Sequence, residues 1–444
     1  MPTIDGPVRV IGRWGDMDAG AREAATYRGL DKIFDPALRE SICELIEDVR
    51  RDGDEAVARA LKKFDGCDVE PGGLRVTEEE FATARAQVSD QLLAAIRDGI
   101  DHVRRFNEQL VSRGDWEFES EPGLTVGEKV TPIASAGLFV PSGKGSYPSV
   151  LVQLGTPAVV AGVPTVAVVV PPVPGSAGVV DPAVLVVASE LGIGDVFRVN
   201  GPAGIAALAF GTQTVPKVRK VVGPGSPAVT CAQVEVQRYG TVTTMLLGPS
   251  ESLIIADDSA DPRLLAADLL NEAEHGPDSS SILVTDSEEL LAATQAEVST
   301  QMAALPEPRR SYAATALGRN GGAILVTDMV EATDVANAYA PEHMQLAVAE
   351  PDTALARLTD AGEILVGQWT PVSAANFVIG CPAALPTSGF AKVSGGITAE
   401  AFRKRSAVAR ADKVSLARMR GSITAFTAHE GFPAHEAAVA IRFP

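Results

Sequence analysis

Cysteine is scarce in this sequence and is never closely paired. The four cysteines, Cys43, Cys67, Cys231 and Cys381, lie far apart, and no CxxC motif occurs among the 444 residues. Scattered cysteines of this kind argue against a disulfide framework and against a zinc site built from thiolates. They also suit a reducing compartment, so we expect a cytoplasmic protein.

Positive charge is also in short supply. The sequence has 57 acidic residues but only 38 lysines and arginines, which gives a formal net charge of −19. A field of this sign repels phosphate backbones and anionic membrane surfaces, so we expect no nucleic-acid partner and no membrane partner. The first residues do not show the basic and apolar pattern of a secretory signal.

Uninterrupted hydrophobic runs are short. The stretch from Gly145 to Val180 contains no charged residue, but prolines interrupt it at positions 148, 157, 164, 171, 172 and 174. A helix that faces lipid tolerates few such breaks, so this stretch is not expected to span a membrane. Its run TVAVVV (165–170) instead predicts a strand that is buried on both faces, as strands of parallel sheets are.

The spacing of apolar residues changes along the chain. Residues 35–115 place them three and four positions apart, which predicts a series of helices. From about Ala136, short Val and Ile runs that end in Gly or Pro alternate with Ala-rich segments, a pattern typical of a doubly wound α/β domain. A second region of the same kind covers 251–367, and the last fifty residues are predicted to be helical.

The few histidines mark the candidate sites. Glu272 and His275 stand three residues apart in a predicted helix and project from one face, as metal ligands can. No second ExxH pair occurs, which excludes a di-iron bundle. Glu342 and His343 are adjacent in an apolar run, and His435 lies in AHEGFPAH near the C-terminus. Each histidine, taken alone, can be a hydrogen-bonded structural residue, a metal ligand or a proton carrier.

Several sequence blocks resemble the histidinol dehydrogenase family. In chain order they read GLFVPSGKGSYPSVL, NGPAGIAALAFGT, KVVGPGS, LLGPSE, NEAEHGPDSSSILVT, APEHMQLAV, LPTSG and EGFPAHEAAVAIR. The resemblance runs over nearly the whole chain, and the combination of blocks in this order is highly specific. It implies an NAD-dependent dehydrogenase that oxidises an alcohol.

The resemblance also implies that Glu342 and His343 are catalytic. His343 would take the proton of the substrate alcohol as hydride leaves for NAD, and Glu342 would deprotonate the water that attacks the aldehyde intermediate. Oxidation of an alcohol to a carboxylate takes two hydride transfers with a hydration between them, so a base must act twice.

The metal site of the family corresponds to an altered set of residues. The family holds zinc with Gln, His, Asp and His, and the matching residues here are Glu272, His275, Asn376 and His435. The set still contains one anionic ligand, although an Asn oxygen is a weaker zinc ligand than a carboxylate. We expect Zn²⁺ or a similar divalent cation to be bound.

The substrate and cofactor positions are partly altered. Ser250 and Glu430 keep the family's substrate-site residues, whereas Ala383 stands where the family usually has His. On the cofactor side, Phe139 replaces a Tyr, Ala203 a Gln, and Ser226 an Asn. The resemblance implies that these three positions contact NAD.

These substitutions favour a paralogue that keeps the reaction type and changes the substrate. We therefore expect oxidation of another small primary alcohol, an amino alcohol or a diol. Two alternatives remain open from the sequence. One is authentic L-histidinol dehydrogenase of histidine biosynthesis, and the other is a ligand-binding paralogue without catalysis.

The resemblance further implies an α/β fold of two incomplete Rossmann-like domains, one inserted in the other, with small helical terminal segments. We expect an N-terminal arm (1–30), a first domain with the Glu-His pair (31–136 and 250–395), a cofactor domain (137–249) and a helical tail (396–444). The tail would exchange between subunits of a homodimer, so that His435 reaches the site of the neighbouring chain.

Overall fold

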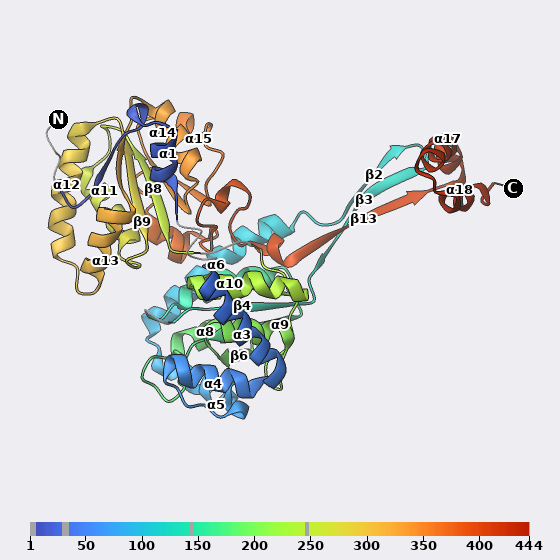
Figure 1. Ribbon diagram of the computed structural model, residues 1–444, viewed down its shortest axis with the longest axis horizontal. Coiled ribbons are helices and arrows are strands. Elements are labelled where there is room, and N and C mark those ends of the chain that lie inside the picture. The colour runs from blue at the N-terminus through green and yellow to red at the C-terminus, as the bar shows by residue number, and fades with distance from the viewer. Residues whose placement is uncertain (1–5, 29–34, 143–144, 245–247, 444) are drawn as a thin grey trace.

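The protein consists of two α/β lobes and a long projecting arm (Figure 1). The computed structural model describes residues 6–28, 35–142, 145–244 and 248–443. Each lobe is built on its own parallel sheet, and the arm is built on a third, antiparallel sheet. The α/β class with two Rossmann-like units, expected from the sequence, is confirmed.

The larger lobe contains a six-stranded sheet in the order β1-β10-β9-β8-β11-β12, and every neighbouring pair is parallel. Its strands are β1 (Val10–Arg13), β8 (Glu251–Ala256), β9 (Ser280–Thr285), β10 (Gly322–Leu325), β11 (His343–Ala347) and β12 (Glu363–Val366). The edge strand β1 comes from the N-terminal arm, so this arm is part of the larger lobe.

Helices cover both faces of this sheet. On one face lie α11 (Pro262–Ala273), α12 (Glu288–Ala303) and α13 (Arg309–Thr315); on the other lie α1 (Ala19–Thr26), α14 (Met329–Tyr339) and α15 (Pro351–Leu355). Within β8, Ile254 packs in the first core and Leu253 and Ile255 pack in the second, because side chains alternate along a strand. A central strand therefore carries apolar residues on both faces, as Leu253–Ala256 do here.

The smaller lobe contains a four-stranded parallel sheet in the order β6-β5-β4-β7. Its strands are β4 (Ser135–Phe139), β5 (Thr165–Val170), β6 (Asp195–Arg198) and β7 (Lys220–Val222). The run predicted to be a buried strand is β5, and its last four residues are fully buried, as expected. None of the helices among the described residues is both long and apolar enough to cross a membrane.

Among the described residues, eight helices pack on the smaller sheet. They are α3 (Pro36–Asp52), α4 (Asp54–Asp65), α5 (Glu78–Gln87), α6 (Asp90–Val111), α7 (Pro148–Val160), α8 (Pro182–Glu190), α9 (Gly201–Phe210) and α10 (Pro227–Val236). One core joins α5 to α8 with one sheet face, and the other core joins α3, α4, α9 and α10 with the opposite face.

This packing differs from the division expected from the sequence. Residues 31–136 were assigned to the domain of 250–395, but α3 to α6 bury their apolar stripes against the smaller sheet. The stripe of α3, with Ile42, Ile46 and Val49, shows that the helix covers an apolar surface. Helical periodicity does not reveal which of two sheets provides that surface.

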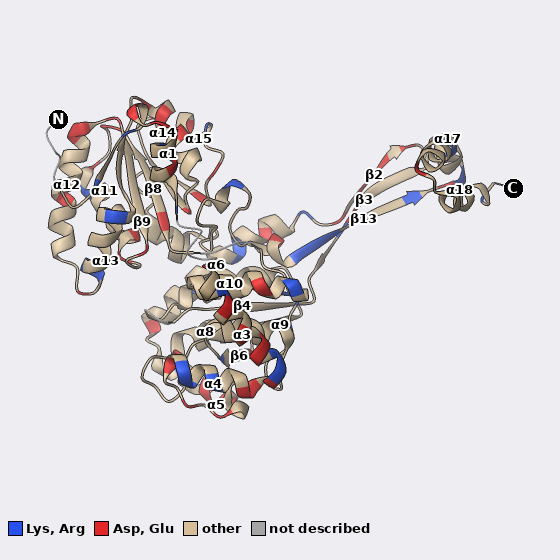
Figure 2. Ribbon diagram, viewed as in Figure 1, with Lys and Arg blue, Asp and Glu red and all other residues tan. Residues whose placement is uncertain are grey.

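The arm is a three-stranded antiparallel sheet in the order β13-β3-β2. Its strands are β2 (Trp116–Glu121), β3 (Leu124–Pro132) and β13 (Arg403–Ala411), and its tip carries α17 (Lys413–Glu430) and α18 (Pro433–Ala440) (Figure 1). Basic residues of β13, blue in Figure 2, form ion pairs with acidic residues of β3 and β2. Arg405 pairs with Glu128 and Arg410 with Glu117, each at 3.1 Å.

The expectation of a purely helical tail over 396–444 is therefore wrong, because β13 lies within it. This strand pairs with β3, which is more than 270 positions earlier in the sequence. Most of its side chains are exposed, so it lacks the apolar alternation that marks a half-buried strand. The strand forms because β3 supplies its backbone hydrogen-bond partners, and the local sequence pattern of 403–411 does not reveal that partner.

Candidate active site

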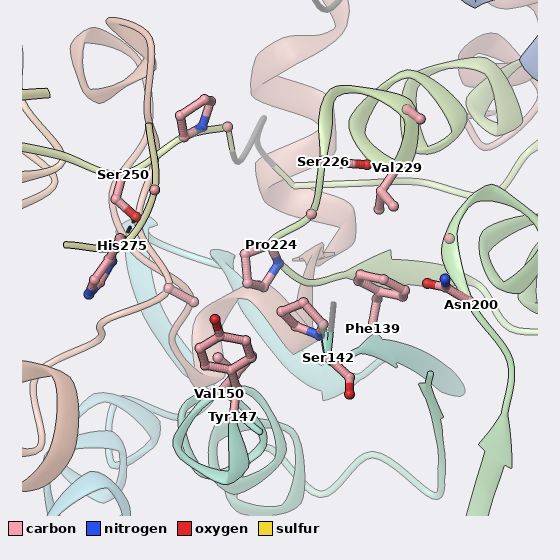
Figure 3. A pocket seen from close by; sticks show the side chains of 18 of the residues that line it. Phe139, Ser142, Tyr147, Val150, Asn200, Pro224, Ser226, Val229, Ser250 and His275 are labelled. Atoms are coloured by element: carbon pink, nitrogen blue, oxygen red, sulfur yellow. Dashed lines mark hydrogen bonds between the residues drawn. The ribbon is translucent and has the colours of Figure 1, made fainter. Parts of the chain in front are cut away.

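A cleft with a volume of about 1770 Å³ lies between the two lobes. It is lined from the larger lobe by Ser250, His275, Glu342, His343, Asn376 and Ala383, and from the smaller lobe by Phe139, Tyr147, Asn200 and Ser226. Figure 3 shows Ser250 and His275 on one side and Phe139, Asn200 and Ser226 on the other. Eight of the twelve residues singled out in the sequence thus lie in one cleft.

The two sheets present opposite ends to this cleft. In the smaller lobe the lining residues follow the carboxyl ends of β4, β6 and β7, where parallel α/β sheets usually bind ligands. In the larger lobe they precede the strands: Ser250 lies before β8, and Glu342 lies before β11. One side of the cleft is therefore the edge of a sheet that usually binds nucleotides. The other side consists of polar residues at the amino ends of the larger lobe's strands.

A strained turn brings the Glu-His pair to this edge. Helix α14 ends at Tyr339, and Ala340 adopts a left-handed conformation with φ of +54°. The chain then passes through Pro341 and enters β11 at His343. A left-handed alanine costs on the order of 1 kcal/mol, and the hydrogen bond from its N–H to the carbonyl of Ala336 supports it.

A close backbone approach fixes the pair from the neighbouring strand. The N–H of Gly362 donates to the carbonyl of Pro341 at 2.9 Å, and the N–H of Glu363 donates to that of Glu342 at 3.0 Å. A Cβ atom at position 362 would lie only 2.5 Å from the Glu342 carbonyl oxygen. Glycine is therefore required for this approach.

Both side chains of the pair are buried and held by hydrogen bonds. The Glu342 Oε2 accepts from the backbone N–H of Glu251 at 3.0 Å, while its Oε1 lies 3.8 Å from His343 Nε2. The other ring nitrogen, His343 Nδ1, lies 2.5 Å from Glu363 Oε1. His343 therefore lies between two carboxylates.

Burial and neighbouring charges shift the titration of this pair. Burial raises the pKa of Glu342 well above its ordinary value, and the carboxylates of Glu272 and Glu251 add to the rise. For His343 burial alone would lower the pKa, but Glu342 and Glu363 raise it to about 10. In the absence of other charges, the pair thus retains at least one proton at neutral pH.

A buried ion pair supports the Glu342–His343 pair. Arg28, from the N-terminal arm, donates to Glu251 Oε1 at 3.1 Å, and both side chains are nearly inaccessible. The same oxygen accepts from the N–H of Ser388 at 2.8 Å. This arrangement anchors the residue whose backbone N–H holds Glu342.

The second Glu-His pair has unmet bonding capacity. Glu272 is fully buried, and neither of its carboxylate oxygens has a hydrogen-bond partner among the described residues. His275 Nδ1 lies 3.6 Å from Glu272 Oε1 and 3.0 Å from Ser250 Oγ (Figure 3). A buried carboxylate without a partner is costly, so this pair suits a bound cation.

The remaining expected metal ligands lie in two different places. Asn376 belongs to η5 (Ala375–Ile379), a π-helical turn after α16 (Val372–Ala374), and it lines the cleft. His435 is exposed on α18 at the tip of the arm, outside the cleft of its own chain. In the described part of the chain no three His, Cys, Asp or Glu side chains form a metal cluster. The local donors thus fit a cation only if a further ligand completes the set.

The substrate and cofactor positions also separate into two groups. Ser250 and Ala383 line the cleft, whereas Glu430 is exposed at the end of α17, near the arm tip. Phe139 and Ser226 lie at the smaller lobe's edge of the cleft, and Ala203 does not line it. Ala203 is buried within α9 and contributes only to the core beneath the cleft.

Sequence inspection missed four residues at this site: Glu251, Glu363, Arg28 and Asn200. Glu251 and Glu363 are charged residues at the first positions of mainly apolar strands, ESLIIA and EILV. That departure from an apolar pattern was the available signal. Arg28 has no such signal, because its partner Glu251 lies 223 positions away.

Comparison with known proteins agrees with this arrangement. The family model described as histidinol dehydrogenase matches residues 31–443. A protein of Mesorhizobium japonicum named histidinol dehydrogenase homolog 2 is 41% identical over 90% of each chain. One of Colwellia psychrerythraea, named histidinol dehydrogenase homolog, is 38% identical over 97% of this chain and 95% of its own.

Relatives with the unmodified name are similar to a comparable degree. A histidinol dehydrogenase of Methanosarcina barkeri is 38% identical over 91% of this chain and 92% of its own. The crystal structure of histidinol dehydrogenase from Elizabethkingia anophelis superposes with a TM-score of 0.92 over 99% of this chain and 98% of that one, at 30% identity.

The two Rossmann-like lobes, the shared cleft and these matches define an NAD-dependent oxidoreductase fold. More narrowly, the chain belongs to the histidinol dehydrogenase family, whose members use NAD and in general bind zinc.

Proposed function

We propose that the protein oxidises a small primary alcohol, an amino alcohol or a diol, with NAD, through the aldehyde to the carboxylate. The observation that carries this proposal is the buried pair Glu342–His343, which opens onto a cleft between two Rossmann-like lobes. Ser250 and His275, whose Oγ and Nδ1 atoms are 3.0 Å apart, line the same cleft and offer polar groups to a substrate hydroxyl.

In the first oxidation, His343 Nε2 accepts the hydroxyl proton of the substrate as the carbinol carbon loses hydride. Glu363 at Nδ1 and Glu342 beside Nε2 favour the imidazolium that results. NAD, when bound, would accept the hydride. A divalent cation held by Glu272 and His275 would polarise the substrate oxygen, and its positive charge would favour release of the proton from His343. General-base catalysis of this kind typically contributes 10²- to 10⁴-fold.

In the second oxidation, Glu342 removes a proton from the water that adds to the aldehyde carbon. Its raised pKa suits a general base, because an ordinary carboxylate is too weak to accept a proton near neutral pH. The hydrate then loses its hydride as His343 accepts a hydroxyl proton again. In total one alcohol and one water give a carboxylate, two hydrides and three protons.

We further propose that a second copy of the chain completes the metal site. Glu272, His275 and Asn376 would hold a divalent cation from one side, with His435 from the arm of the other copy as the fourth ligand. Glu430 of that arm would reach the substrate pocket. Exposed apolar side chains at the arm tip support a covered surface there: Val414, Phe426, Phe432 and Ile441.

The assembly and the metal are tested separately from activity. Light scattering at micromolar concentration should give the mass of a dimer, and a monomer would contradict the completed site. Elemental analysis of protein prepared without chelator should give about one divalent cation per chain. A value well below one would contradict the metal proposal.

The choice of substrate rests on Ala383. This residue lines the cleft where the family usually has His, and its methyl group cannot donate a hydrogen bond to an imidazole or other polar group. Its backbone N–H is already used, since it donates to Gln153 Oε1 at 3.2 Å. The altered pocket therefore lacks a polar partner that would favour the imidazole of histidinol, and we infer an alcohol without that group.

The test is NADH formation at 340 nm by zinc-supplemented protein. L-histidinol would be compared with 2-amino-1-propanol and 1,2-propanediol, and NAD binding would be measured first. We expect turnover of a small amino alcohol or diol at a higher kcat/KM than L-histidinol. Rapid formation of two NADH per L-histidinol would instead identify a histidinol dehydrogenase. Binding of NAD without oxidation of any alcohol would favour a ligand-binding paralogue.

A further inference from the structure

Glu363 is a buried carboxylate that no sequence motif singled out. It opens β12 and is paired in register with His343, the first residue of β11. Its Oε1 lies 2.5 Å from His343 Nδ1, and both side chains are almost completely inaccessible. Among the described residues its Oε2 has no hydrogen-bond partner, so the contact with His343 is the hydrogen bond that this side chain makes.

This contact constrains the proton and the plane of the imidazole. A carboxylate oxygen at 2.5 Å from Nδ1 requires a proton between the two atoms, because two lone pairs would otherwise repel. The Nδ1–H form is therefore fixed, and the ring directs Nε2 towards Glu342 Oε1 at 3.8 Å and towards the cleft. A neutral His343 held in this way has its lone pair on the nitrogen that faces the substrate.

We propose that Glu363 is a positioning residue that holds His343 in its Nδ1–H form and orients Nε2 as the base. This inference rests on the proposed dehydrogenase function. Buried acids serve histidine bases in the same way in hydrolases, where they orient the ring and stabilise the imidazolium. Here the same carboxylate serves the base in both oxidations.

Stability alone does not account for a carboxylate at this position. The residues that follow Glu363 in β12 are apolar, and those that follow His343 in β11 are apolar except Gln345. Burial of a charge costs several kcal/mol unless the interaction with its partner offsets that cost. An apolar pair between neighbouring strands would satisfy packing without that cost. The carboxylate therefore has a role that depends on the imidazole.

The chain offers a matched control on the same strand. Gln345, two residues after His343, donates from Nε2 to Asp268 Oδ2 at 2.8 Å, and both residues are buried. Asp268 does not line the cleft. Glu363→Gln and Asp268→Asn each replace a buried carboxylate that bonds to β11 by the amide of the same shape.

Steady-state kinetics of the two variants test the proposal. We expect Glu363→Gln to lower kcat by about 100-fold or more, with KM for the alcohol and the affinity for NADH changed less than about twofold. Asp268→Asn should keep the kcat of the wild type at a similar melting temperature. Equal losses of kcat in both variants, or an unchanged kcat in Glu363→Gln, would overturn the proposal.

A second measurement does not depend on turnover. In protein labelled with ¹⁵N-histidine, which has five sites, we expect wild-type His343 to keep its proton on Nδ1 and to lose the one on Nε2 when high pH makes the ring neutral. Glu363→Gln should weaken this preference, because an amide can either accept or donate a hydrogen bond at the same place. An unprotonated Nδ1 in the wild type would overturn the positioning role even if the enzyme turns over alcohol. If no alcohol is oxidised, the proposed function fails, and the nitrogen signal still decides the role of Glu363.

Discussion

The two Glu-His pairs of the cleft differ in how completely their polar atoms are bonded. Glu342 and His343 are held by the N–H of Glu251 and by the carboxylate of Glu363. Glu272 has two buried oxygens without a partner among the described residues, although His275 lies only 3.6 Å away. We call the first the complete pair, because a hydrogen bond within the chain anchors each of its two side chains, and the second the incomplete pair, because the described residues give the Glu272 carboxylate none.

This difference indicates two kinds of task. A proton carrier must have fixed geometry before the substrate binds, so its hydrogen bonds are built into the fold. A cation site needs free lone pairs, so its ligands remain unpaired until the cation is bound. The complete pair corresponds to the proposed catalysis and the incomplete pair to the proposed metal site.

Removal of the complete pair's base should have the largest effect. We expect His343→Ala to lower kcat for the alcohol by at least about 10³-fold, because the variant loses the proposed general base of both oxidations. NAD binding should be unchanged, since the smaller lobe is intact. A residual activity above a tenth of the wild type would mean that another group is the base.

Most substitutions of buried residues lower stability, but substitution of Glu272 in the incomplete pair should not do so when no cation is bound. Glu272→Gln removes a buried charge that has no partner, so in chelator-treated protein we expect an equal or higher melting temperature. With zinc present the variant should bind about 10- to 100-fold more weakly and be less stable than the wild type. A lower melting temperature in both conditions would show that Glu272 is satisfied without a cation.

The pH dependence of the unfolding free energy should reflect the charged surroundings of His343 in the complete pair. The pKa of His343 is raised in the folded state to about 10 from an ordinary 6.5. Its charge therefore stabilises the fold fully below about pH 6.5, and this contribution is lost as the pH rises towards 10. In metal-free protein the difference in unfolding free energy between the wild type and His343→Gln should shrink over this range. A difference that is constant from pH 7 to 10 would contradict the charged environment of His343.

A small change next to the complete pair should have the smallest effect. Gly362→Ala places a Cβ atom at 2.5 Å from the Glu342 carbonyl, so we expect a loss of about 1–3 kcal/mol in unfolding free energy. Gly194→Ala is the control, since nothing lies within 4 Å of its Cβ position, and its effect should stay within about 0.5 kcal/mol. Urea unfolding measures both, and equal effects would show that the strand approach is not tight.

The α/β class and the membership in the family could be predicted from the sequence, because buried strands such as β5 and long motif blocks are local signals. Most of the expected site residues also lie in one cleft. The helices of 36–111 were assigned to the wrong sheet, and β13 was missed, because both depend on partners that are distant in the sequence.

The supporting residues of the site were harder to predict for a related reason. Glu363 contacts His343 only because β12 lies beside β11. Arg28 contacts Glu251 only because the N-terminal arm reaches β8. Ala203 was expected beside the cofactor, but α9 turns its side chain into the core. A motif thus identified the residues that we propose to be catalytic, whereas the contacts that orient them come from the tertiary fold.

The most direct measurement of the two-step account is product analysis with Glu342→Gln. The variant keeps His343 and the shape of residue 342 but removes the base for water. We predict one NADH per alcohol and accumulation of the aldehyde, at a rate of first oxidation close to that of the wild type. Equal losses in the oxidation of alcohol and of added aldehyde would contradict separate roles for the two residues.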